Sequence, residues 1–274
     1  MAEAKSIGKV KGFGEIFQVC APLNEQILAL NRVGIQAPYL ATPEQVAQIR
    51  LAGTSNEFSR TSLAPIKAEG EPTILYRDSP LMNPLMAVVA VNAHRNGQCP
   101  LFSREVYEAV KQIAKSQEGL APEDRDAHVL QGKADNEGKF QLTPEADDAR
   151  FILRTATANY FKKFNHVSIP FYDIPADLPK DKSAVNYLWF GGPGGGSWLD
   201  VGSWDLSGGD RAFGVLVGAE GPQKNLGYRI TDLDKAIATA TPETLRQLNL
   251  SGLESTLASP LRKKILEIVR TQEQ

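Results

Sequence analysis

The chain has 274 residues, of which 42% are hydrophobic and 23% are charged, and its formal net charge is -2 at pH 7. This length is enough to bury most of the apolar surface of one large domain or of two small ones. The near-neutral charge excludes a global basic field that would attract nucleic acid or an anionic membrane. A local basic patch is still compatible with it.

The same sequence features favour a cytoplasmic protein. Two cysteines are too few for a disulfide framework. The N-terminus, Met-Ala-Glu-Ala-Lys-Ser over residues 1–6, lacks the apolar core of a signal peptide. The longest apolar run, residues 85–91, is far shorter than the ~20 residues that a membrane-spanning helix needs. We therefore expect no membrane contact.

The first elements of the chain are a strand and two helices. Residues 9–20 mix β-branched and aromatic residues with glycine, which is typical of a twisted strand. Residues 22–34 predict a helix that begins at a proline and ends at a glycine. The clearest helix start is Thr-Pro-Glu-Gln at residues 42–45. There the threonine can cap, the proline occupies the first helical position, and the glutamine can reach back to close a capping box.

The middle of the chain continues this mixture. Residues 73–77 predict a strand, residues 85–92 a buried element of either type, and residues 103–116 an amphipathic helix. From 118 to 139 the apolar content falls and charged residues and glycine dominate. This stretch is the best candidate for a loop or a boundary. We expect a single α+β domain over residues 1–274, or, alternatively, a subdivision at 118–139.

The second half predicts one long helix, an irregular stretch and two strands around a glycine-rich loop. Residues 144–164 begin acidic and end basic, as the helix dipole favours. Three prolines argue against regular structure over 168–183. Residues 184–190 and 212–219 predict the strands that enter and leave the loop, and the tail from residue 231 is predicted to be helical in short pieces. Strands and helices do not alternate strictly, so the expected fold is α+β, with a mixed or antiparallel sheet, several flanking helices and a helical C-terminal tail.

All three tryptophans lie in one glycine-rich segment, residues 189–210, which we call the Trp/Gly segment. It is neither a P-loop nor a dinucleotide fingerprint, because no Gly-Lys-Ser/Thr ends it and no helical pattern follows it. Glycine allows close approach of a partner, and aromatic faces stack on bases, sugars or side chains. Alternatively, the tryptophans fold back into the core. The candidate ligand- or partner-binding residues are Trp189, Trp198, Trp204, Gly194, Gly195 and Gly196.

Charged residues around the last expected strand favour a different, enzymatic interpretation. Asp205 and Asp210 precede this strand, and Glu220 and Lys224 follow it. In metal-dependent nucleases, carboxylates in such positions hold Mg²⁺ and the lysine steadies the attacking water. The usual spacing places the lysine two residues after the second acid, whereas here it comes four residues after. Solvated loop acids are the alternative.

These patterns lead to three functional hypotheses. The first is an intracellular binding or assembly protein that uses the Trp/Gly segment to contact a protein partner, or a second copy of the chain, with no evident cofactor. The second is a nuclease-like, Mg²⁺-dependent phosphodiester hydrolase with Asp205, Asp210 and Glu220 as metal ligands, Lys224 as the catalytic helper and nucleic acid as the substrate. The third is a small-molecule enzyme that uses the glycine loop as a lid. We favour the first.

Overall fold

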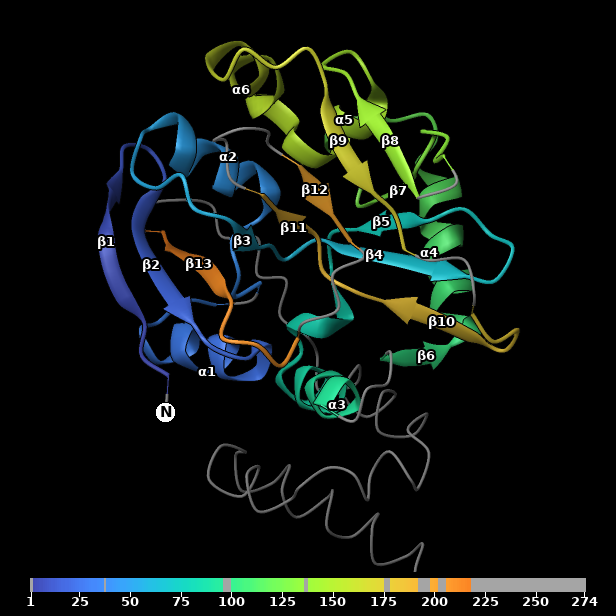
Figure 1. Cartoon of the computed structure of the whole chain (residues 1–274), viewed down its shortest axis with the longest axis horizontal. Coiled ribbons are helices and arrows are strands. Elements are labelled where there is room, and N and C mark those ends of the chain that lie inside the picture. The colour runs from blue at the N-terminus through green and yellow to red at the C-terminus, as the bar shows by residue number, and fades with distance from the viewer. Residues whose placement is uncertain are drawn as a thin grey trace, which may run out of the picture.

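The computed structural model describes residues 2–36, 38–95, 100–135, 138–174, 178–191, 198–201 and 206–217. Within these ranges the chain forms two β-sheets with helices packed against them (Figure 1). The expected α+β class is therefore confirmed. The helical tail expected from residue 231 and the centre of the glycine loop lie outside the described residues.

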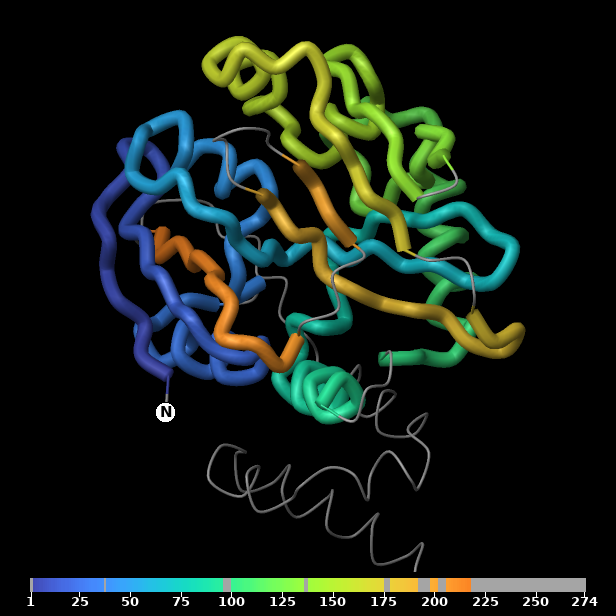
Figure 2. The backbone as a smooth tube through the Cα atoms, viewed as in Figure 1, coloured from blue at the N-terminus to red at the C-terminus, as the bar shows by residue number. Residues whose placement is uncertain are grey.

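The first sheet contains eight of the described strands and joins the beginning of the chain to its later part. In spatial order these strands are β1 (Lys5–Val10), β2 (Gly14–Cys20), β13 (Arg211–Leu216), β3 (Ser59–Arg60), β11 (Trp189–Phe190), β12 (Leu199–Asp200), β9 (Ile169–Tyr172) and β8 (Lys139–Leu142). The blue hairpin of β1 and β2 lies beside the orange β13 in Figure 2. The sheet is mixed, because β12 pairs with β9, and β13 with β3, in parallel.

The second sheet is antiparallel and contains five described strands. In spatial order they are β6 (Leu101–Ser103), β10 (Lys182–Val185), β4 (Ala64–Ala68), β5 (Ile74–Tyr76) and β7 (Ala127–Val129). Two stretches of chain pass side by side between the sheets, one from β3 to β4 and one from β10 to β11. Asn186 N donates to Pro65 O at 3.0 Å, and Leu188 N donates to Leu63 O at 2.9 Å. Backbone hydrogen bonds thus join the stretch from β10 to β11 to Leu63 and to Pro65, near the start of β4, in the region between the sheets.

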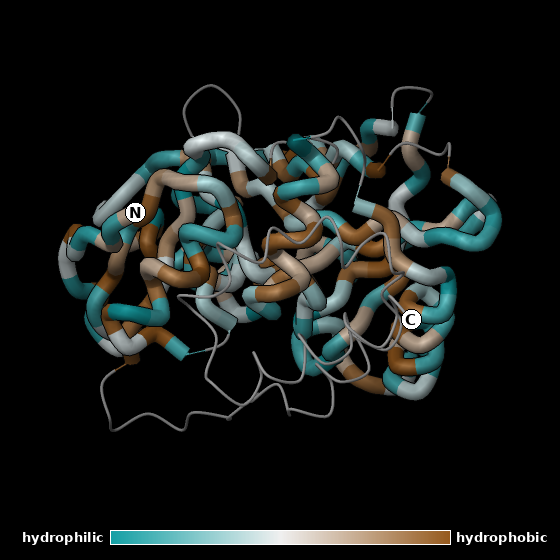
Figure 3. The backbone as a smooth tube through the Cα atoms, turned by 90° about the horizontal axis from the view of Figure 1, so that it is seen from below, coloured by the Kyte–Doolittle hydropathy of each residue, from teal (hydrophilic) through white to brown (hydrophobic). Residues whose placement is uncertain are grey.

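Helices cover the sheets from several sides. The α-helices are α1 (Leu23–Arg32), α2 (Pro43–Leu51), α3 (Pro84–Arg95), α4 (Arg104–Ser116), α5 (Asp147–Leu153) and α6 (Thr157–Lys163), and the 3₁₀ helices are η1 (Pro80–Met82), η2 (Pro122–Asp124) and η3 (Arg154–Ala156). α1 packs against α3 and β2, α2 against α5 and α6, and α4 against β4, β5, β7 and β10. In Figure 3 the brown, hydrophobic segments run through the interior of the molecule.

Several local predictions are confirmed. Thr42 Oγ1 accepts a hydrogen bond from Gln45 N at 3.2 Å, and Gln45 Oε1 accepts one from Thr42 N at 2.8 Å. α2 therefore begins with the expected capping box and with Pro43 in its first turn. The strand expected at 73–77 is β5, and the undecided element at 85–92 belongs to α3.

Three local predictions were wrong. The single strand expected over 9–20 is instead the end of β1, a turn at 11–13 and β2, which pair as a hairpin. The helix expected over 144–164 is divided into α5, η3 and α6, because Arg154 has a left-handed φ of 48° that ends α5. Thr157 Oγ1 donates to Arg154 O at 2.7 Å and so satisfies a carbonyl at this break. The stretch 168–183, expected to be irregular, contains β9 and the beginning of β10. Pro170 is tolerated because β12 pairs with β9 only at Phe171 and Tyr172, so that Pro170 has a neighbour in register on β8 alone.

The charged stretch 118–139 contributes η2, β7 and the first residue of β8 to the fold. β7 joins the second sheet by pairing with β5. A subdivision of the chain at this stretch stays a prediction.

Gly214 in β13 lies at a close approach that leaves no room for a side chain. A Cβ there would lie 2.7 Å from Leu30 Cδ2 and from Ile35 Cδ1, and 3.1 Å from Tyr39 O. We expect Gly214→Ala to lower the free energy of unfolding by about 1–3 kcal/mol, because the methyl group overpacks this contact. Gly209→Ala is the matched control, since no atom lies within 4 Å of its added Cβ. Urea denaturation followed by circular dichroism measures both variants, and equal losses would contradict the prediction.

Candidate functional site

The structure describes the two ends and one inner part of the Trp/Gly segment, at 189–191, 198–201 and 206–210. It places two of the predicted binding residues, Trp189 in β11 and Trp198 just before β12. The other four, Trp204, Gly194, Gly195 and Gly196, lie outside the described residues, and their binding role stays a prediction.

A buried arginine of α2 fixes the start of the segment. Arg50 is only 1% exposed, and its Nη2 donates to Phe190 O at 2.9 Å and to Glu57 O at 2.8 Å. Its Nη1 donates to Tyr160 Oη at 2.8 Å, and its Cζ lies 4.2 Å from the centroid of the Phe190 ring. Burial lowers the pKa of Arg50, and the contact with Tyr160 opposes that shift. Arg50 therefore ties β11 to α2 and α6.

A second buried arginine fixes the end of the segment. Arg60 is 0% exposed, and its Nη2 lies 2.8 Å from Asp210 Oδ2. Its Nη1 donates to Ala21 O at 3.0 Å, and its Cζ lies 5.1 Å from the centroid of the Tyr187 ring. Asp210 O also accepts hydrogen bonds from Ala21 N at 3.1 Å and from Gln26 Nε2. The segment is thus tied to β3 and to the start of α1.

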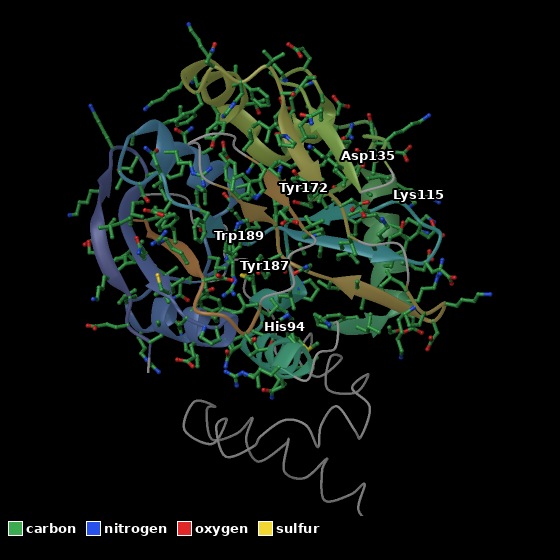
Figure 4. The ribbon with its side chains drawn as sticks, viewed as in Figure 1. His94, Lys115, Asp135, Tyr172, Tyr187 and Trp189 are labelled. Carbon is green, nitrogen blue, oxygen red and sulfur yellow. The ribbon has the colours of Figure 1, made fainter. Side chains whose placement is uncertain are left out.

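The strands around the segment have one buried face and one half-buried face, because successive residues of a strand point to opposite sides. The buried residues lie in register across β8, β9, β12 and β11, and they are Phe140, Phe171, Leu199 and Phe190. Their neighbours form a second row in register, which we call the outer row: Lys139, Tyr172, Asp200 and Trp189. Each residue of the outer row is half-buried. Figure 4 labels Tyr172 and Trp189 on either side of β12.

Trp189 belongs to a stack of aromatic rings. The centroids of Phe58 and Trp189 are 5.2 Å apart with the planes at 29°, and Tyr187 lies 6.1 Å from Trp189. Arg211 Cζ lies 5.5 Å from the centroid of Phe58, which is 40% exposed. Arginines therefore cover both ends of the stack, with Arg211 on Phe58 and Arg60 on Tyr187.

Trp198 adds a further exposed ring to the same face. Its side chain is 36% exposed, and its carbonyl accepts a hydrogen bond from Gly191 N at 2.8 Å. The indole ring lies directly against Gly191, since a Cβ at that glycine would be 2.5 Å from Trp198 Cδ2. Glycine at position 191 is what lets the ring pack there. We call Phe58, Tyr172, Trp189 and Trp198 the aromatic surface.

Sequence reasoning found only part of this surface. It identified Trp189 and Trp198 from their place in a glycine-rich segment. It missed Phe58, which lies just before β3 and stacks on Trp189, and Tyr172, which reaches the same face from β9. Neither belongs to a local motif, so only the pairing of strands could have placed it.

The four residues of the nuclease-like hypothesis are only partly described. Asp210 is paired with Arg60, whereas Asp205, Glu220 and Lys224 lie outside the described residues. In the part of the chain that the structure describes, no group of three or more His, Cys, Asp or Glu residues could hold a metal ion. The Mg²⁺ site and the hydrolase activity stay predictions.

The histidines serve different local contacts. His128 is buried, and its Nε2 lies 2.7 Å from Asp148 Oδ1, while its ring stacks on Phe151. His94 Nδ1 lies 3.1 Å from Ser207 Oγ, so that α3 contacts the end of the Trp/Gly segment. His128 therefore links β7 to α5 and has a structural role.

Comparisons with known proteins give a likeness in fold. No protein-family model and no curated protein sequence matches the chain. A solved structure from a study of how the C-type lectin fold accommodates massive sequence variation in Nanoarchaeota resembles it with a TM-score of 0.51. The match covers 76% of this chain and 100% of that chain, at 13% sequence identity. At this identity the likeness shows the fold alone. Among the described helices, none is both long and apolar enough to cross a membrane.

Because Arg60 is fully buried, the loss of Asp210 should weaken the fold. We expect Asp210→Ala to lower the free energy of unfolding by about 1–3 kcal/mol, since a buried guanidinium loses its charged acceptor. Asp181→Ala is the matched control, because Asp181 is 77% exposed and pairs with Lys182 only at the surface, at 3.4 Å. Its effect should stay within about 0.5 kcal/mol. Urea denaturation compares the two, and a loss for Asp210→Ala no larger than that of the control would refute the anchoring role.

Proposed function

We propose that the chain is a binding or assembly protein whose aromatic surface contacts a protein partner or a second copy of the chain. The observation that carries this proposal is that two tryptophans and a phenylalanine stay partly exposed on a backbone that buried arginines hold in place. Large aromatic side chains are enriched among the residues that dominate the binding energy of protein interfaces. Exposed groups of them are typical of interaction sites.

The packing of the rings supports the same function. Phe58 and Trp189 are stacked, and Trp198 is seated on Gly191, so these rings need little further ordering when a partner arrives. Association is weakened by the entropy lost when interface side chains become immobile, at about 0.5–1.5 kcal/mol for each. A preorganised aromatic surface avoids much of that loss.

The structural likeness supports the proposal in one respect. In Nanoarchaeota the C-type lectin fold accommodates massive sequence variation. A fold that stays intact while its sequence varies is suited to presenting different surfaces to different partners. In this chain, the aromatic surface is one surface of this kind.

Removing the exposed indole of Trp198 tests the proposal. We expect Trp198→Ala to weaken partner binding or self-association by about 30-fold or more, as a central aromatic residue of an interface does. Leu120→Ala is the matched control, because Leu120 is a large exposed side chain away from the aromatic surface. Sedimentation equilibrium measures self-association, and affinity capture followed by titration of the purified partner measures partner binding.

The unfolding free energy of both variants must be measured in parallel. We expect Trp198→Ala to change it by less than about 1 kcal/mol, since the ring is partly exposed. Unchanged binding by a folded Trp198→Ala variant would remove the basis of the proposal. A variant that unfolds would place the ring in the core instead.

Gly191→Ala tests the contact between Gly191 and the Trp198 indole without removing the indole itself. The added Cβ would lie 2.5 Å from Trp198 Cδ2, so the ring must move away. We expect weaker binding together with a red shift of tryptophan emission, because the displaced indole contacts more water. Gly119→Ala is the control, since nothing lies within 4 Å of its added Cβ. Emission and affinity that match the control would show that the ring is not held by this glycine.

A further inference from the structure

We infer that one face of α3 is a docking surface and that its occupant is the stretch 260–271 of the same chain. We call this surface the outer face of α3. It shares no residue with the aromatic surface, so the inference goes beyond the proposed function. Three observations carry it: the composition of α3, the burial of a leucine that belongs to neither hydrophobic cluster, and the spacing of apolar residues over 260–271.

α3 is apolar on both of its sides. Every residue from Leu85 to Val91 is apolar. Because an α-helix has 3.6 residues per turn, these residues divide between two opposite faces. The inner face joins the hydrophobic cluster beside α1 and contains Ala87, Ala90 and Val91. The outer face contains Leu85, Val88 and Val89. A helix at a water-exposed surface normally has polar residues on its outer face, whereas a helix that is hydrophobic all round is buried.

Leu85 shows that the outer face is covered. Its side chain is only 4% exposed, although it is absent from both hydrophobic clusters that the described residues form. Val88 and Val89 are half-buried and are absent from these clusters too. In Figure 1, α3 lies at the lower edge of the described part, and both sheets lie above it. The cover of Leu85 therefore comes from outside the two clusters.

The stretch 260–271 has an apolar stripe that suits this face. Its large apolar residues follow the i, i+4, i+7, i+8 spacing of an amphipathic helix, and they are Leu261, Ile265, Ile268 and Val269. The opposite side of such a helix carries Lys263, Glu267 and Arg270. A single helix of about 12 residues is only marginally stable in water, so this one needs a surface to pack on. The stretch lies outside the described residues, and its helix is a prediction from the sequence.

The rest of the sequence favours this stretch as the occupant. The same spacing counted from Leu245 meets Asn249 and Gly252, so the helix predicted to start at Pro242 has a broken stripe. The last described residue is Val217. The roughly 40 residues that connect it to Pro260 span well over 100 Å when extended, so the connection is long enough to reach α3.

Methyl NMR on the whole, unmodified chain tests the inference without any variant. We expect nuclear Overhauser contacts from the methyl groups of Val88 or Val89 to those of Ile265 or Ile268, because packed apolar side chains approach within about 4.5 Å. Contacts from the outer face only to residues 96–99, only to the stretch 242–253, or to no residue beyond Val217 would overturn the inference.

A mixed sample identifies which copy supplies the stretch. One half of the sample carries methyl labels only on isoleucine, and the other half only on valine and leucine. We expect no contact between the two labels in this mixture, since the stretch and the outer face belong to one chain. A contact that persists in the mixture would show that a second copy is the occupant, and the inference would be wrong.

A charge on the outer face tests whether it holds the stretch. We expect Val89→Asp to speed amide hydrogen exchange over 261–270 by about tenfold or more, because a carboxylate cannot be buried in an apolar contact without a partner. Val167→Asp is the matched control, since Val167 is 87% exposed, and its effect should stay within about twofold. Amides of α1 that stay protected show that the variant is folded. Unchanged exchange over 261–270 in a folded Val89→Asp variant, or an equal change in the control, would refute the docking.

Discussion

Two guanidinium groups inside the protein determine where the Trp/Gly segment can lie. A charged group without partners is very costly to bury, so each buried arginine needs fixed acceptors close to its guanidinium group. Arg50 finds acceptors in the Phe190 carbonyl and the Tyr160 hydroxyl, and Arg60 finds them in Asp210 and the Ala21 carbonyl. The acceptors lie at the beginning and the end of the segment. The hydrogen bonds that these two buried arginines make therefore also position the candidate binding surface.

Because side chains alternate along each strand, the sheet has one face that belongs to the core and one face that carries the outer row. On one face, rings such as Phe140 and Phe171 stack at 4.8 Å and belong to the buried core. On the other face, the outer row places charged and aromatic residues in register. One set of strands thus supports the stability of the domain and the chemistry of its surface. A shift in register by one residue would exchange the two sets of side chains.

Much of the fold could be predicted from local patterns, whereas the site could be predicted only in part. The capping box of α2 and the amphipathic helix α4 depend on residues a few positions apart, and the sequence displays such spacings directly. The break at Arg154 depends on one backbone angle that propensities do not report. Phe58 and Tyr172 join the surface through pairing between strands far apart in the chain. Periodicity indicates which face a residue takes but not which strand lies beside it.

The pairing of β2 with β13 has a consequence for how the protein is made. On the ribosome, the residues of β1 and β2 emerge long before residues 211–216. The edge of β2 that pairs with β13 is therefore unpaired during that time. An unpaired edge is open to wrong strands from the same or another chain. The charged side chains of Lys5 and Lys9 and the irregular register between Ser6 and Gly8 protect the far edge, on β1, but not the β2 edge. Sheets that depend on pairing between strands far apart in the sequence form slowly. The nascent chain therefore depends on its last described strand to close the sheet that its first strands begin.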